Sequence, residues 1–254
     1  MADLLEFDEC KMYFGIPYKI NDYVTITPPT IGEIIEWGEN KYFSMVHLLT
    51  AIPSDMKSHL FDLGVDYEEI SDFDFFIYLC KNISKEQTSI ILGDLDLSQL
   101  IPLTNEETGK VSLYTPIFSD GKNVSVEICI DELAYVKLSN YLRKLHGITS
   151  KVEHAANKTT KRILIELDRQ KKAELSKEPK KSNLFPLISA MMRYPGFKYK
   201  SNELKECGIY EFIDTVKGAN IYIQSTSLLA GSFSGFMDTS KIPKKNFDWM
   251  RAAE

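Results

Sequence analysis

The feature that most restricts the fold of this chain is the pair Pro28 and Pro29, which separates two kinds of hydrophobic spacing. Before the pair, residues 18–27 alternate polar with β-branched or aromatic residues, as strands do. Proline cannot donate a ladder hydrogen bond and disfavours helix at the residue before it, so the strand must end there. The sequence therefore predicts a strand or hairpin arm that is followed directly by a helix.

The helix after the prolines has a complete start signal. Thr30 is a suitable N-cap, and Glu33 completes a capping box in which each side chain binds a backbone amide. Large apolar residues then recur at helical spacing, which predicts one helix with one buried face. They are Ile31, Ile34, Ile35, Tyr42 and Val46.

Further along, helical and strand-like segments alternate. A Ser71 cap and dense aromatics predict a core helix at 71–83, and residues 85–100 predict a short helix that breaks near Gly93. Next, two alternating runs flank a turn with Asp-Gly at its centre, which predicts a β-hairpin near 110–130. Residues 131–147 return to helical spacing.

The C-terminal third begins with a charged run. Residues 158–181 hold nine basic and four acidic side chains and predict an exposed helix that ends near Pro179. After it comes a compact part with a capped start at Ser201 and a long apolar-rich span. We therefore predict a mainly α protein with a minor β component, an α+β fold. Its parts are an N-terminal helical domain at 1–178, carrying the hairpin insertion, and a C-terminal helical part at 183–254.

The charge distribution is uneven along the chain. The net charge is −6, yet the first hundred residues hold 18 acidic and 6 basic side chains, and the remainder holds 18 acidic and 24 basic ones. A general nucleic-acid binder needs a basic face. The basic run 158–181 lacks interleaved aromatics and contains acidic partners at helical spacing, so a solvated helix is favoured over a nucleic-acid contact.

Signals for export, for membranes and for enzyme chemistry are lacking in the sequence. The acidic start and the lack of a long apolar run predict a cytoplasmic protein that does not bind membranes, and the four scattered cysteines indicate neither a disulfide framework nor a zinc site. No P-loop or dinucleotide fingerprint occurs, and Phe233 occupies the nucleophile position of the run Gly231–Gly235. We predict no catalytic residue, no cofactor and no enzyme activity; a site built from scattered carboxylates is the alternative.

Two pairs of aspartates have a spacing that can hold a divalent cation. They are Asp72 with Asp74 and Asp94 with Asp96. The first pair also suits the first turn of a helix, where negative charge complements the helix dipole, and the second pair suits a turn. We favour these structural roles and predict no metal site.

A cluster of large apolar residues near the C-terminus is the best candidate for a binding surface. Leu228, Leu229, Phe233 and Phe236 lie among glycines and serines, which permit close approach or bending. Such a composition favours an adaptable partner-binding groove. Core packing is the alternative.

Three stretches in order along the chain resemble one protein family. They are PPTIGEIIEWGENKYF, LTAIPSDMKSHLFDLGVDYEEISDFDFF and PGFKYKSNELKECGIYEFIDTVK. They are similar to tail assembly proteins of tailed phages and prophages of Gram-positive bacteria, whose gene typically precedes that of the tape measure protein. The resemblance implies a non-catalytic chaperone that coats the long, apolar tape measure protein in the host cytoplasm until the tail tube polymerises.

The resemblance leaves a second function and a second partner open. A virion structural protein, such as a tail-completion or baseplate-associated component, is the second function considered. The expected partner is the tape measure protein, with self-association as an alternative, and neither nucleic acid nor membrane is expected as a partner.

Overall fold

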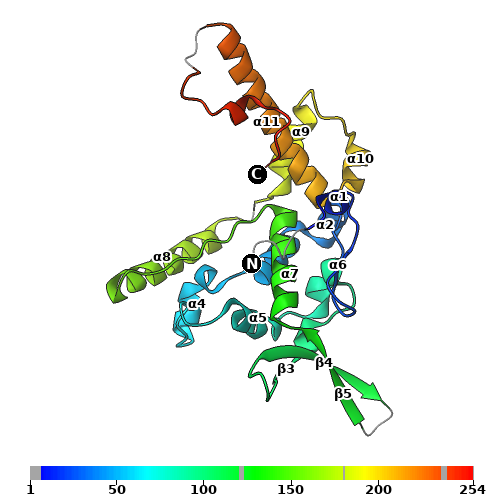
Figure 1. Ribbon diagram of the computed structural model, residues 1–254, viewed down its shortest axis with the longest axis vertical. Helices are drawn as coiled ribbons and strands as arrows, with labels where there is room; N and C mark the ends of the chain where they lie inside the picture. Colours follow the sequence, from blue (N-terminus) through cyan, green and yellow to red (C-terminus); the bar gives the residue numbers. More distant parts are fainter. Residues whose placement is uncertain (1–6, 120–122, 180, 236–238, 254) are drawn as a thin grey trace.

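The computed structural model describes residues 7–119, 123–179, 181–235 and 239–253 (Figure 1). The fold is mainly α with a minor β component, as the sequence predicts. The strands are β1 (Tyr18–Lys19), β2 (Thr25–Ile26), β3 (Ile101–Thr104), β4 (Val111–Ser119) and β5 (Asn123–Ile130). They form two antiparallel sheets, β1–β2 and β3–β4–β5.

The helices fall into an N-terminal body, residues 7–177, and a C-terminal part, residues 183–253. The helices of the body are α1 (Glu9–Tyr13), α2 (Ile31–Trp37), α3 (Glu39–Thr50), η2 (Pro53–Asp55), α4 (Lys57–Asp62), α5 (Asp72–Cys80), α6 (Lys85–Leu92), η3 (Leu97–Gln99), α7 (Glu132–His146) and α8 (Lys158–Lys177). Those of the C-terminal part are α9 (Leu184–Arg193), α10 (Ser201–Glu206), α11 (Ile209–Phe233) and η4 (Lys244–Phe247).

The junction after the two prolines has the predicted capping box. The Glu33 amide donates to Thr30 Oγ1 at 3.2 Å, and the Thr30 amide donates to Glu33 Oε2 at 2.8 Å. The prediction of one continuous helix is wrong, because the chain turns at Gly38, whose φ of 108° favours glycine, and α3 starts on a new axis. Ile35, predicted to be buried, is 52% exposed, whereas Ile31 and Ile34 of the same helix are buried, so the buried face of α2 is narrower than predicted.

The core of the body lies between α5, α7 and α3. Helix α5 is the predicted aromatic core helix, and its Phe75 and Phe76 are fully buried. The ring of Phe76 lies 4.7 Å from that of Tyr135 on α7. At the other end of α7, the side chain of His146 bonds to Tyr42 of α3. These contacts tie together elements that are far apart in the sequence.

The predicted hairpin consists of β4 and β5, which pair in antiparallel register. Its turn, residues 120–122, lies outside the described residues. The sequence did not predict β3, which pairs with β4 and makes the sheet three-stranded. Figure 1 shows this sheet at the end of the body opposite to the C-terminal part.

The basic helix α8 lies against α4 rather than standing in solvent on all sides. Asp168 accepts hydrogen bonds from the Ser58 amide at 2.9 Å and the Ser58 hydroxyl at 2.6 Å. Arg169 forms an ion pair with Asp62 at 2.6 Å. Lys161 pairs with the carboxylates of Asp66 and Glu68. Most of α8 is exposed, as the sequence predicts, and its remaining face packs on the first half of the chain through pairs of basic and acidic residues.

The C-terminal part attaches to the body through α2 and α3. The Ile31 amide donates to the Cys207 carbonyl at 2.9 Å, and the Ile209 amide donates to the Pro29 carbonyl at 3.0 Å. The Glu39 carboxylate accepts the Leu184 amide at 2.9 Å at the start of α9.

The start of α10 differs slightly from the predicted capped start at Ser201. The cap is Lys200, whose amide donates to Glu203, and Ser201 is the first helical residue. Residues of both parts contribute to one buried cluster. The division of the chain into domains at 1–178 and 183–254 stays a prediction.

Candidate partner-binding site

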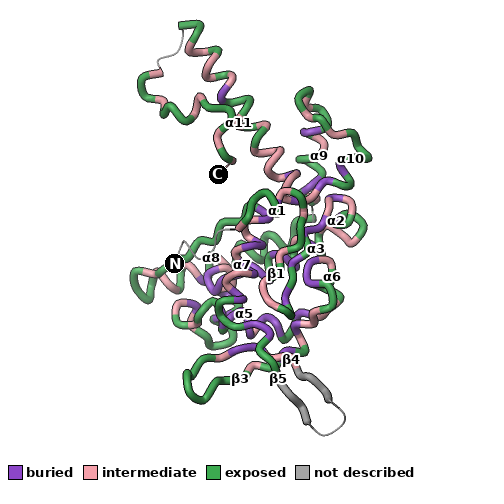
Figure 2. The backbone as a smooth tube through the Cα atoms, turned by 45° about the vertical axis from the view of Figure 1, so that its right-hand side comes forward, coloured by how far each residue is buried: buried purple, intermediate pink, exposed green. Residues whose placement is uncertain are grey.

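Helix α11 is unusual in how little of its apolar surface is covered. Its buried residues are Ile209, Phe212 and Ser225. From Gly218 to Phe233 the sequence contains sixteen consecutive uncharged residues. The solvent side of a helix in a monomeric protein normally carries charged residues. Figure 2 shows this helix as mostly intermediate or exposed, in contrast to the buried segments of the body.

A groove runs along one face of α11, and we call it the aromatic groove. Its volume is about 690 Å³. It lies between α11, the end of α9 with the loop that follows, α1 and the C-terminal segment. The lining residues are Tyr13, Met191, Tyr194, Gly196, Phe197, Lys198, Tyr199, Asp214, Thr215, Gly218, Ala219, Tyr222 and Trp249.

The floor of the aromatic groove is formed by the smallest side chains of α11. Gly218 and Ala219 follow Asp214 by one helical turn and precede Tyr222 by another, so these residues share one face. A Cβ atom placed on Gly218 would meet no atom within 4 Å. The floor is therefore open enough for the backbone of a second helix to approach α11 closely.

One wall is the loop after α9, which its own turns hold in place. The Tyr194 amide donates to the Met191 carbonyl at 3.0 Å, and the Phe197 amide donates to the Tyr194 carbonyl at 3.0 Å. A Cβ on Gly196 would lie 2.7 Å from the Tyr194 ring, so the ring packs directly over this glycine. The Tyr199 hydroxyl donates to Glu211 of α11, and this bond raises the pKa of Tyr199.

The opposite wall comes from the C-terminal segment, which folds back along α11. The Ser225 hydroxyl donates to the Asn246 carbonyl at 2.9 Å, which fixes η4 on the helix. This places Trp249 at a ring distance of 5.8 Å from Tyr222, in edge-on contact. Both rings remain about half exposed, and half-exposed aromatic side chains are enriched at protein interfaces.

The charges in the aromatic groove are few. Asp214 is partly buried, and burial raises the pKa of its carboxyl group, which the nearby Lys217 opposes. Lys198 contributes the only other formal charge among the lining residues. The groove can thus hold a mainly apolar segment, and Asp214 and Lys198 can orient polar groups at its edge.

The predicted partner-binding residues lie farther along α11 than the groove. Leu228 and Leu229 are half-buried, and Phe233 is 86% exposed, which excludes core packing for Phe233. Phe236 lies outside the described residues. The structure places the described three on the same helix as the groove floor but does not bring them into the groove. Sequence reasoning missed the groove, although three aromatics around Pro195 and Gly196 were a usable signal.

The aspartate pairs have the structural roles that the sequence favours. Asp74 lies in the first turn of α5, where its amide donates to Ser71 Oγ. Asp94 pairs with Lys85 at 2.7 Å, and Asp96 accepts the Ser98 amide. In the described part of the chain, no group of three or more His, Cys, Asp or Glu side chains is placed to hold a metal ion.

Within the described ranges, no helix combines the length and apolar character needed to cross a membrane. No protein-family model, curated protein or solved structure matches the chain.

Proposed function

We propose that this protein is a tail assembly chaperone of a tailed phage or prophage. In this role its C-terminal part holds an apolar helical segment of the tape measure protein. The observation that supports the proposal is the uncharged, poorly covered segment of α11 beside the aromatic groove. A helix that exposes apolar residues on its solvent side gains free energy when a partner covers them.

The groove suits a helix better than an extended peptide. Its floor is one face of α11 with small residues, and its walls are aromatic, so an amphipathic helix can lay its apolar face into it. The contact continues along α11 to Leu228, Leu229 and Phe233. Because the groove carries few charges, binding depends on burial of apolar surface and is reversible without a chemical step.

The identity of the partner follows from the resemblance of the sequence to tail assembly proteins. A tape measure protein is long, helical and apolar, and before tube assembly it would expose surface that aggregates. The proposal places the protein in the host cytoplasm, without nucleic acid or membrane as a partner. The net charge of −6 is consistent with this.

The function is tested by co-expression of the full chain with a tagged helical fragment of the tape measure protein encoded next to it. We expect the fragment to be soluble and to co-purify with the chain, and to aggregate when expressed alone. The proposal is wrong if the fragment aggregates equally in both cases. Mass spectrometry of purified particles then distinguishes the alternative, since a chaperone is absent from them and a virion component is present at fixed stoichiometry.

A further inference from the structure

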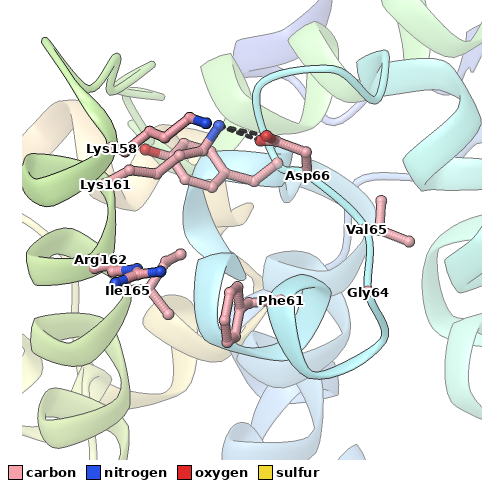
Figure 3. A pocket seen from close by; sticks show the side chains of 9 residues that line it. Phe61, Gly64, Val65, Asp66, Lys158, Lys161, Arg162 and Ile165 are labelled. Atoms are coloured by element: carbon pink, nitrogen blue, oxygen red, sulfur yellow. Dashed lines mark hydrogen bonds and ion pairs between the residues drawn. The ribbon is translucent and has the colours of Figure 1, made fainter.

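A second cavity, on the N-terminal body, combines apolar walls with unpaired cations; we call it the α4–α8 pocket. It lies where the start of α8 faces the end of α4 and the loop after it (Figure 3). Its volume is about 310 Å³, at the lower end of the range of roughly 300–1,000 Å³ found for small-ligand pockets. The lining residues are Phe61, Gly64, Val65, Asp66, Tyr67, Lys158, Lys161, Arg162 and Ile165.

The walls of the α4–α8 pocket are mostly apolar. Ile165, the buried residue of α8, lies at the base, and Phe61 and Val65 stand at the side with partly exposed side chains. Gly64 has a φ of 74°, and a Cβ there would meet nothing within 4 Å, so that side is open. Tyr67 is buried, and its hydroxyl has no hydrogen-bond partner among the described residues. An apolar group entering from the Gly64 side would therefore be covered on several faces.

The three cations of the pocket differ in how far they are neutralised. Lys161 forms ion pairs with Asp66 and Glu68, and Figure 3 shows the contact with Asp66. Lys158 and Arg162 lie one helical turn apart on the same face of α8. Both side chains are exposed, and over the ranges that the structure describes neither forms an ion pair or a hydrogen bond.

Lys158 and Arg162 lie near the amino end of α8, which is itself partly positive. Helix α8 has no acidic residue in its first turn. The amino end of a helix carries a partial positive charge, which cations there do not offset and an anion would. Farther along the same helix, Arg169 forms ion pairs with Asp62 and Glu166.

We propose that the α4–α8 pocket binds an apolar group that carries one carboxylate. The guanidinium of Arg162 would donate two parallel hydrogen bonds to the carboxylate, as arginine forks do with planar anions. The apolar body would lie between Phe61, Val65 and Ile165. Such a ligand is either a free small carboxylate or the C-terminal end of a peptide with an apolar last residue. The site is separate from the aromatic groove and does not depend on the chaperone role.

The test uses amide NMR spectra of the isotopically labelled full chain. Hydrocinnamate and its neutral amide are the small probes; acetyl-Gly-Gly-Phe with a free or an amidated end is the peptide probe. We expect saturable shifts in residues 61–67 and 158–165 with the acids, and binding about tenfold weaker with the amides. Arg162→Gln should weaken binding of the acids about tenfold, whereas the control Arg169→Gln on the same helix should change it by less than about twofold.

The outcomes separate the two ligand sources and the failure of the proposal. Tighter binding of the peptide acid than of hydrocinnamate supports a chain end as the ligand, and equal or weaker binding supports a free carboxylate. Thermal midpoints of both arginine variants show that each is folded. Shifts that do not saturate at millimolar probe, equal binding of acids and amides, or an unchanged affinity in Arg162→Gln would overturn the proposal.

Discussion

Replacing Phe212 with alanine is expected to lower the free energy of unfolding by about 3–5 kcal/mol, the range for deleting a buried aromatic side chain. Phe212 is 0% exposed and belongs to the central buried cluster. It lies in the first turn of α11, and the next residue, Ile213, lies 3.8 Å from a Cβ placed on Gly147 at the end of α7. Its loss would leave a cavity where the C-terminal part joins the body.

The matched control is Phe233→Ala, the same substitution at the far end of the same helix. Because Phe233 is 86% exposed, its removal should change the free energy of unfolding by no more than about 0.5 kcal/mol. Urea unfolding curves of both variants and the wild type measure the difference. Equal effects of the two substitutions would contradict the attachment of α11 described above.

Acidification from about pH 7 to about pH 5 is expected to cost about 2 kcal/mol of stability through His146 alone. Burial lowers the pKa of His146 to about 4. Its Nε2 lies 2.6 Å from the Tyr42 hydroxyl, and its Nδ1 lies 2.7 Å from the Leu142 carbonyl. A neutral ring satisfies both contacts when Nδ1–H donates to the carbonyl and Nε2 accepts from the hydroxyl.

The sign of this effect follows from which state binds the proton. An unfolded histidine titrates near pH 6.5, so between about 6.5 and 4 the unfolded chain takes up a proton that native His146 does not. The contribution of His146 to the free energy of unfolding is therefore fully present above about pH 6.5, and it falls as the pH drops from about 6.5 to about 4. Urea unfolding curves at several pH values measure the slope.

Two variants isolate the contribution of His146. In His146→Gln the pH slope between about 7 and 5 should fall by most of its wild-type value, because the amide does not titrate. Tyr42→Phe should cost about 1 kcal/mol for the lost hydrogen bond but keep the slope, since the histidine remains buried. A wild-type slope in His146→Gln would assign the pH dependence to other groups.

The elements that the sequence predicted well are those specified by neighbouring residues. The capping box of Thr30 and Glu33 and the Ser71 cap each depend on side chains three residues apart, and both are present. The hairpin of β4 and β5 follows from two alternating runs around one turn. Local chemistry determines these features, so it can be read without the rest of the chain.

The features that the sequence did not predict depend on contacts between distant segments. The break at Gly38 changes which residues of α2 and α3 face the core, and periodicity alone does not locate such a turn. Helix α8 lies on α4 because acids at 62–68 meet bases about a hundred residues later. The uneven charge of the chain contained that signal, but not the pairing.

The candidate site shows the same limit. The sequence directed attention to the apolar residues of α11, and the structure describes three of them on the surface of that helix. The aromatic groove, however, needs the loop after α9 and Trp249, which Ser225 brings to α11 through Asn246. No spacing rule within one segment predicts a groove whose walls come from separate parts of the chain.

The most direct test of the central proposal is to fill the floor of the aromatic groove without disturbing the fold. Gly218→Phe places a large side chain where a Cβ meets no atom within 4 Å. Replacing a glycine inside a helix also stabilises the helix, by up to about 1 kcal/mol. The control is Ala173→Phe, at an exposed position of α8 outside the groove and outside α11. Both are co-expressed with the tape measure fragment, and capture and thermal midpoint are recorded.

We expect Gly218→Phe to keep or raise the thermal midpoint and to reduce capture of the fragment at least about tenfold, because the added ring occupies the space of the bound helix. Ala173→Phe should capture the fragment to within about twofold of the wild type, since it leaves the groove and the exposed face of α11 unchanged. Capture by Gly218→Phe at the wild-type level, with an unchanged midpoint, would contradict the proposal that the aromatic groove holds the partner.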